Sequence, residues 1–97
     1  MKIEHHPAVE DELRHIIEYY NQRVPGLGTS FLSDFDHQIV LIAANPEIWA
    51  AISADIRCSL LKRFPYAVYF RVTQNRGIRV IVVKHQKRHP AYGIRRK

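Results

Sequence analysis

Basic side chains dominate the last part of the sequence, and their charge is the chemistry that stands out first. Twelve lysines and arginines lie between Arg57 and Lys97, where there is no aspartate or glutamate. All nine acidic residues lie at or before Asp55, against three basic ones, so residues 1–55 carry a net charge of −6 and residues 56–97 carry +12. A field this concentrated attracts anionic partners and orients them as they approach. The sequence therefore predicts that the basic part binds an acidic partner.

The cysteine and histidine residues show no pattern typical of a metal or redox site. Cys58 is the single cysteine, so no internal disulfide is possible, and its neighbours Ile56 and Leu60 indicate a small core residue. His5 and His6 are adjacent, and no Cys or His pair has the spacing of a zinc site. We expect no metal and no cofactor.

Length and composition predict a single domain that covers residues 1–97. The chain is 46% hydrophobic, which is enough for one core but, at this length, too little for two. No segment approaches the roughly 18 apolar residues that a membrane span needs. The N-terminal residues contain no apolar signal core. We therefore expect a cytoplasmic protein that does not contact the membrane.

The first half of the chain predicts a short strand and two helices. Ile3 alternates with polar neighbours over residues 2–5, and Pro7 suits the first turn of a helix. Apolar residues then recur every three or four positions until Pro25, and again from Phe31 until Asn45 and Pro46. Two helices joined by a short turn form an antiparallel hairpin with one shared apolar side.

The second half predicts three strands, because the apolar period changes there from 3.6 to 2. Residues 56–62, 66–73 and 78–85 alternate between apolar and polar side chains and are separated by short turns. Such strands form an antiparallel meander. The expected fold is α+β with the order β-α-α-β-β-β, in which the helix hairpin packs on one face of a small, mainly antiparallel sheet.

Strict alternation assigns the strand residues to two faces. The face expected under the helices contains Cys58, Leu60, Tyr66, Val68, Phe70, Val72, Ile78, Val80 and Val82. The opposite face is expected to contain Arg57, Ser59, Leu61, Arg63, Tyr69, Arg71, Arg79, Ile81, Val83 and His85. An apolar surface with charged edges usually marks an interaction site.

Several phrases, taken together, give the chain its resemblance to a known family. They are the helix start from His6 to Leu13, the segment from Tyr19 to Phe31, the Asn45-Pro46 stop, the strand phrase from Arg63 to Phe70, and the ending from His85 to Tyr92. In order and spacing, these phrases resemble the RelE/ParE superfamily of toxins from bacterial type II toxin-antitoxin systems. The resemblance covers nearly the whole chain.

The resemblance implies a growth-inhibiting toxin that an acidic, partly disordered antitoxin neutralises. It also implies that operator DNA is bound only through the toxin-antitoxin complex. The basic half of the chain is an independent reason to expect an acidic partner. Residues expected to bind the antitoxin or the target are Arg57, Leu61, Lys62, Arg63, Tyr69, Arg71, Arg79, Ile81 and Val83.

The superfamily contains ribosome-dependent mRNA endonucleases of the RelE type and inhibitors of DNA gyrase of the ParE type. Metal-independent RNA cleavage needs groups that transfer protons and cations that stabilise the charge on phosphorus. If the chain is such a nuclease, His85 and Tyr92 are the candidates for proton transfer. Arg88 is the leading candidate for charge stabilisation, with Lys62, Arg63 and Arg71 as further cations.

Two departures from the nuclease pattern favour the other branch. RelE nucleases usually carry an arginine after the strand tyrosine, whereas Ala67 follows Tyr66 here. Gln86 stands where another arginine is expected. The chain therefore resembles the ParE and plasmid-stabilisation branch more closely, which implies a non-enzymatic inhibitor of gyrase, with a metal-independent endoribonuclease as the alternative.

A plain nucleic-acid-binding module is a third possibility. Single-strand platforms interleave cations with aromatic side chains that stack on bases. On the expected basic face, Tyr69 is the only such aromatic residue. The sequence therefore disfavours this class.

Overall fold

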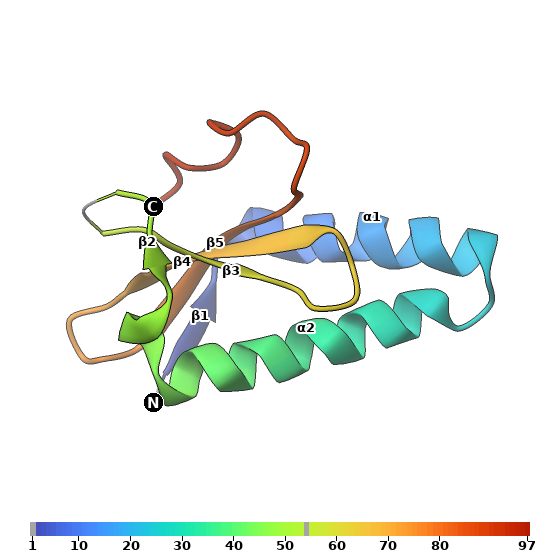
Figure 1. Ribbon diagram of the computed structural model, residues 1–97. Helices are drawn as coiled ribbons and strands as arrows, with labels where there is room; N and C mark the ends of the chain where they lie inside the picture. The colour runs from blue at the N-terminus through green and yellow to red at the C-terminus, as the bar shows by residue number, and fades with distance from the viewer. Residues whose placement is uncertain (1, 54) are drawn as a thin grey trace.

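The computed structural model describes residues 2–53 and 55–97 as two helices packed against a five-stranded sheet (Figure 1). None of its helices in these ranges is both long and apolar enough to cross a membrane. The elements in chain order are β1 (Ile3–His5), α1 (Pro7–Arg23), α2 (Leu27–Ala44), the short 3-10 helix η1 (Pro46–Ile48), β2 (Ala50–Ala51), β3 (Arg57–Leu60), β4 (Tyr66–Val72) and β5 (Ile78–His85).

The sheet has the strand order β1-β5-β4-β3-β2. Strands β3, β4 and β5 form the predicted antiparallel meander, and β1 pairs in parallel with β5. The expected α+β fold is therefore confirmed. The sequence did not predict β2, because two residues are too few to show an alternating pattern.

Local sequence signals set the helix boundaries. The His6 Nδ1 atom accepts a hydrogen bond from the Ala8 N–H at 3.1 Å, and Pro7 occupies the first turn of α1. Gly26 adopts a left-handed conformation with φ of 87° and lets the chain turn into α2. The helices approach closely at Gly28, where an added Cβ would lie 2.2 Å from the Ile17 carbonyl oxygen. This approach fixes the hairpin.

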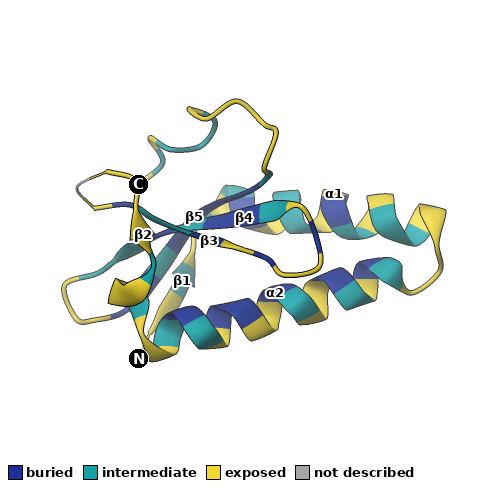
Figure 2. Ribbon diagram, viewed as in Figure 1, coloured by how far each residue is buried: buried dark blue, intermediate teal, exposed yellow. Residues whose placement is uncertain are grey.

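The main core lies between the hairpin and the sheet. Figure 2 shows buried residues, in dark blue, along both helices and through the central strands. Phe31 of α2 is fully buried, and its ring centroid lies 5.3 Å from that of Phe64 and 5.4 Å from that of Tyr66. The predicted helix stripes and the apolar positions Val68, Phe70, Ile78 and Val80 all contribute to this core.

A β-bulge in β5 reverses part of the predicted face assignment. Tyr69 pairs with Val82 but Phe70 pairs with Val80, so Ile81 is an extra residue on β5. One extra residue moves every following side chain to the other face. Val82 therefore packs on the face away from the helices, whereas Val83 joins the helix-side core. His85 lies on the helix side too, next to Tyr66, so its expected place on the basic face was wrong.

The face assignment was also reversed in β3. Ser59 is buried and accepts a hydrogen bond from the Gln38 side-chain amide of α2, while Leu60 is 55% exposed. Cys58 pairs across the sheet with Tyr69 on the opposite face. A polar residue can lie inside when another buried polar group satisfies it, and alternation of polarity cannot reveal such a pair. Leu61 follows the end of β3 and is buried in the helix-side core.

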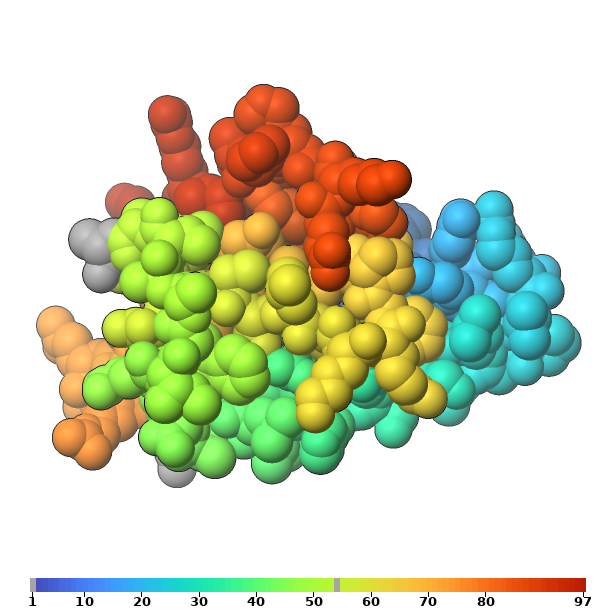
Figure 3. All heavy atoms as spheres, viewed as in Figure 1, coloured from blue at the N-terminus to red at the C-terminus, as the bar shows by residue number. Residues whose placement is uncertain are grey.

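The C-terminal segment, residues 86–97, covers part of the face that the helices leave free. Tyr92 and Ile94 pack against Ile56, Ile81 and Val82 in a second apolar cluster. In the space-filling view the red C-terminal atoms lie on the side away from the green atoms of α2 (Figure 3). The expected open interaction face is therefore partly occupied by the chain itself.

Candidate functional site

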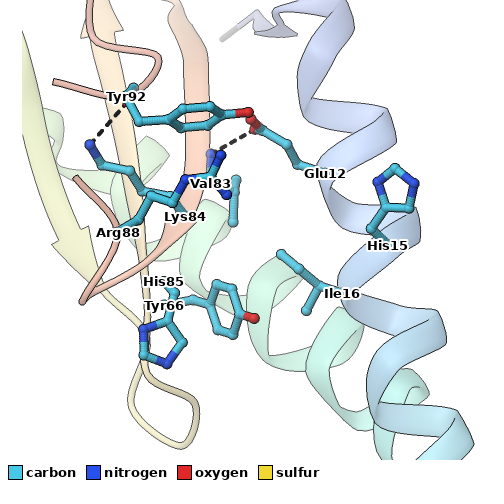
Figure 4. Close-up of a pocket in the computed structure, with 9 residues that line it drawn as sticks. All are labelled: Glu12, His15, Ile16, Tyr66, Val83, Lys84, His85, Arg88 and Tyr92. Carbon is cyan, nitrogen blue, oxygen red and sulfur yellow. Dashed lines mark hydrogen bonds between the residues drawn. The ribbon is translucent and has the colours of Figure 1, made fainter. Parts of the chain in front are cut away.

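A pocket of about 200 Å³ lies between α1, the end of β5 and the C-terminal segment (Figure 4). It brings together residues from four separate parts of the sequence. Its lining consists of Glu12, His15, Ile16, Tyr66, Val83, Lys84, His85, Arg88 and Tyr92. All three residues predicted as catalytic in a nuclease, His85, Arg88 and Tyr92, therefore lie in one pocket.

Lys84 is buried at the base of the C-terminal segment, with only 4% of its surface exposed. Its ammonium group donates hydrogen bonds to the carbonyl oxygens of His89 at 3.1 Å, Pro90 at 2.7 Å and Tyr92 at 3.0 Å. Burial lowers the pKa of Lys84, and the positive charges of Arg88 and Arg96 act in the same direction. All three donors of this ammonium are committed to the fold of the C-terminal segment.

Glu12 of α1 lies between the sheet and the C-terminal segment. Its carboxylate accepts a hydrogen bond from the Val83 N–H at 3.1 Å and another from Arg96 Nη1 at 2.7 Å. Arg96 Nη1 also donates to the Ile81 carbonyl oxygen at 3.1 Å. Strand β1 pairs with β5 only as far as Val80, so Glu12 and Arg96 satisfy backbone groups that no neighbouring strand reaches.

The candidate catalytic side chains lie on different walls of the pocket. His85 packs edge-on against Tyr66 with ring centroids 5.2 Å apart, and its Nδ1 atom accepts the Lys87 N–H at 3.0 Å. The Arg88 guanidinium lies 3.8 Å from the centre of the Tyr92 ring. Burial raises the pKa of Tyr66. In Figure 4, His85 and Tyr66 lie apart from the Arg88 and Tyr92 pair.

Three of the predicted binding residues lie on the face beside the C-terminal segment. Arg71 forms an ion pair with Asp55 and donates to the Arg96 carbonyl oxygen at 3.1 Å. Arg79 donates to the Lys97 carbonyl oxygen at 2.6 Å. Tyr69, half-buried, packs against the second apolar cluster. The basic face thus binds its own chain end largely through carbonyl oxygens.

The other predicted binding residues are dispersed. Lys62 and Arg63 are exposed in the β3–β4 connection, where the Arg63 N–H approaches Asp34 of α2. Arg57 donates to the carbonyl oxygens of Glu47 and Trp49 and so ties β3 to η1. The apolar members Leu61, Ile81 and Val83 are 5%, 0% and 2% exposed. These three cannot present a side-chain surface to a partner in this conformation.

The sequence gives little indication that Glu12 and Lys84 hold the C-terminal segment. Glu12 is one of three consecutive acidic residues near the start of a predicted helix, and Lys84 is one of twelve basic residues in the last part of the chain. The one available signal of burial for Lys84 is that it directly follows a run of four apolar residues, Val80 to Val83. In residues 2–53 and 55–97, no group of three or more His, Cys, Asp or Glu is placed to hold a metal ion.

Tyr69 gives the fold a testable dependence on alkaline pH. Burial raises the pKa of Tyr69 to about 12, and the neighbouring Cys58 adds to this shift. Because the unfolded tyrosine loses its proton near pH 10, the stabilising effect is fully present below that pH and is lost as the pH rises toward 12. We expect the free energy of unfolding, measured in urea, to fall less steeply over this range in Tyr69→Phe than in the unchanged protein. Tyr19→Phe, which changes an exposed tyrosine, is the control, and equal slopes in all three proteins would contradict the prediction.

The comparisons with known proteins agree with this architecture. A family model described as the ParE toxin of the type II toxin-antitoxin system parDE matches residues 3–90. No curated protein matches the chain. The fold is similar to a structure of the chromosomal ParDE TA system from P. aeruginosa, with a TM-score of 0.76 and 18% identity over 88% of this chain and 95% of that one. It is also similar to the isolated E. coli RelE toxin, with a TM-score of 0.66 and 17% identity over 94% of this chain and 89% of that one.

Proposed function

Because the chain belongs to the ParE toxin family of type II toxin-antitoxin systems, we propose that it inhibits growth by acting on DNA gyrase and that an acidic antitoxin neutralises it. Membership of the family establishes that the chain is a toxin. We favour gyrase over messenger RNA as its target because the pocket that contains the candidate nuclease residues is poorly suited to binding RNA.

The main support for gyrase as the target is that the charged groups of Glu12 and Lys84 are already bound to other groups of the protein. A phosphodiester needs unopposed cations, because its own charge grows as the phosphorus is attacked. The one buried cation of this pocket, Lys84, already donates to three carbonyl oxygens. The Glu12 carboxylate beside it neutralises a second cation, Arg96, so neither positive charge is left unopposed for a phosphate. Ala67, at the place where RelE nucleases usually carry an arginine, is 1% exposed and supplies no charge. This pocket is better suited to holding the C-terminal segment than to binding RNA.

The test is expression without the antitoxin, combined with assays of both targets. Growth should stop with a DNA-damage response, and purified protein should inhibit supercoiling by gyrase while messenger RNA on ribosomes stays intact. Messenger RNA cleavage without gyrase inhibition would contradict the proposal. The same protein mixed with its antitoxin is the control and should leave gyrase active.

RelE-like, ribosome-dependent cleavage is the second candidate, favoured by one observation. His85, Arg88 and Tyr92 line the same pocket, with Tyr66 beside His85. If this pocket cleaves RNA, His85→Ala or Arg88→Ala should lower the cleavage rate at least about 100-fold, the usual contribution of a group that transfers protons or stabilises the charge of the transition state. Unchanged toxicity in both variants would exclude this candidate.

The antitoxin is expected to reach the basic side of the sheet. Tyr69, Arg71 and Arg79 are half-buried there, beside the C-terminal segment, and Lys62 and Arg63 are exposed in the β3–β4 connection. A carboxylate is a stronger acceptor for a guanidinium than the carbonyl oxygens that Arg71 and Arg79 now bind. An acidic segment can therefore compete for these cations. In this proposal, operator DNA is bound only through the antitoxin complex.

A further inference from the structure

The chain leaves β5 through two consecutive turns that are built in the same way. In the first turn, the Arg88 N–H donates to the His85 carbonyl oxygen at 2.9 Å. In the second, the Tyr92 N–H donates to the His89 carbonyl oxygen at 3.0 Å, and Pro90 occupies the position at which a turn favours proline. Each turn therefore has a histidine at its first position.

The imidazole of each histidine closes its turn a second time. The His85 Nδ1 atom accepts the Lys87 N–H, and the His89 Nδ1 atom accepts the Ala91 N–H, both at 3.0 Å. Aspartate and asparagine close turns in the same way, through an oxygen that accepts the N–H two residues later. A histidine nitrogen can accept only while it carries no proton, because a protonated imidazole has two donors and no acceptor. Both turns therefore require a neutral histidine.

The surroundings of the two turns oppose added positive charge. Residues 84–97 contain six basic residues and no acidic one. Within residues 2–53 and 55–97, neither histidine forms an ion pair with a carboxylate. The ionisable groups around the turns are Tyr66 of β4, Glu12 and His15 of α1, Lys84 of β5, and Lys87, Arg88, Tyr92 and Arg96 of the C-terminal segment. Glu12, the one carboxylate among them, already binds Arg96, so a proton on either imidazole adds to an excess of positive charge.

The second turn is also the part of the C-terminal segment that Lys84 holds. The Lys84 ammonium donates to the carbonyl oxygens of His89, Pro90 and Tyr92. When this turn opens, the three oxygens move and a nearly buried ammonium loses its acceptors, which is costly. Opening therefore spreads from the turn to the rest of the segment, where Tyr92 and Ile94 cover the second apolar cluster.

We propose that these turns make the position of the C-terminal segment depend on pH, with the segment closed while His85 and His89 are neutral and open when both are protonated. Protonation removes two hydrogen bonds from the closed form and none from the open form. The closed form is thus favoured at high pH and is lost as the pH falls through the range of about 8 to 5 in which histidine side chains change charge. Opening releases Arg71 and Arg79, which now bind carbonyl oxygens of the segment.

Amide hydrogen exchange of the purified protein at about pH 8 and about pH 5, corrected for the intrinsic pH dependence of exchange, tests this proposal. In the unchanged protein, protection of the amides in residues 87–92 should fall at least about tenfold at the lower pH, as expected for the loss of two hydrogen bonds. In the double variant His85→Asn with His89→Asn, the side-chain oxygens still accept the same N–H groups but take up no proton. Its protection should be nearly equal at both pH values. The double variant His85→Ala with His89→Ala lacks both acceptors and should show low protection at both.

His37→Asn is the matched control, because His37 is exposed on α2, and it should keep the full pH dependence. Local exchange is the readout rather than global unfolding, because His6 also accepts a backbone N–H, at the start of α1. Equal pH dependence in the double asparagine variant and the unchanged protein would overturn the inference. A second measurement needs no variant: in an NMR titration, the loss of protection should follow the protonation of His85 and His89. Protection that stays constant, or that follows another histidine, would also overturn the inference, and either result leaves the proposed function intact.

Discussion

Phe31→Ala is expected to destabilise the fold by about 3–5 kcal/mol, the largest effect of any single substitution considered for this chain. Phe31 is fully buried, and its ring lies among those of Tyr20, Phe64 and Tyr66. Removing the ring leaves a cavity at the contact between α2 and the sheet, which the neighbouring aromatic rings cannot fill without leaving their own contacts. The loss is a large fraction of the roughly 5–15 kcal/mol by which a domain is stable.

Urea unfolding followed by circular dichroism measures this loss. The neighbouring Leu32→Ala is a matched control, because Leu32 is on the same helix but 36% exposed, and it should cost about 1 kcal/mol or less. Phe31 also supports the pocket, because Tyr66 packs on Phe31 on one side and on His85 on the other. A stability loss for Phe31→Ala no larger than that for Leu32→Ala would show that the aromatic cluster contributes little.

Glu12→Ala is expected to cost about 3 kcal/mol and to loosen the C-terminal segment. The Glu12 and Arg96 side chains are only 13% and 17% exposed, and removing one partner of a largely buried pair leaves the other charge uncompensated. The substitution also leaves the Val83 N–H without its acceptor. Urea unfolding gives the stability, and amide hydrogen exchange over residues 89–97 gives the local effect, which should be faster exchange.

Two further variants separate the charge of Glu12 from its hydrogen bonds. Glu12→Gln keeps an acceptor for the Val83 N–H and should cost less than Glu12→Ala. Arg96→Ala keeps that hydrogen bond but leaves the Glu12 charge and the Ile81 carbonyl oxygen without a partner, so it should cost about as much as Glu12→Ala. In a double-mutant cycle of Glu12→Ala and Arg96→Ala, we expect a coupling energy of about 1–3 kcal/mol, as for residues in direct contact. Additive losses would show that the two side chains stabilise the fold independently.

Membership of the ParE family establishes the toxin class, and the structure restricts which residues a partner can touch. The burial of Leu61, Ile81 and Val83 restricts which predicted residues a partner can touch. The exposed cations Lys62 and Arg63 and the half-buried Arg71 and Arg79 are therefore the residues to test first for antitoxin binding.

The two helices, the three-stranded meander, their order and the separation of charge could all be predicted from the sequence alone. Pro7, Gly26 and Asn45 act on the backbone close to their own positions, so the helix boundaries could be predicted locally. The periods of 3.6 and 2 gave the hairpin and the meander, because each apolar stripe must be covered. The net charges of −6 for residues 1–55 and +12 for residues 56–97 follow directly from the sequence.

Which side chains contact one another could be learned only from the folded structure. The extra residue Ile81 is visible only in the pairing of β5 with β4, and it moved Val82, Val83 and His85 to faces that strict alternation did not predict. Ser59 is buried because Gln38, 21 residues earlier, supplies its hydrogen bond. The pocket likewise joins Glu12 to residues more than 50 positions later. Such contacts depend on strand register and on long-range packing, and neither leaves a periodic signal in a single sequence.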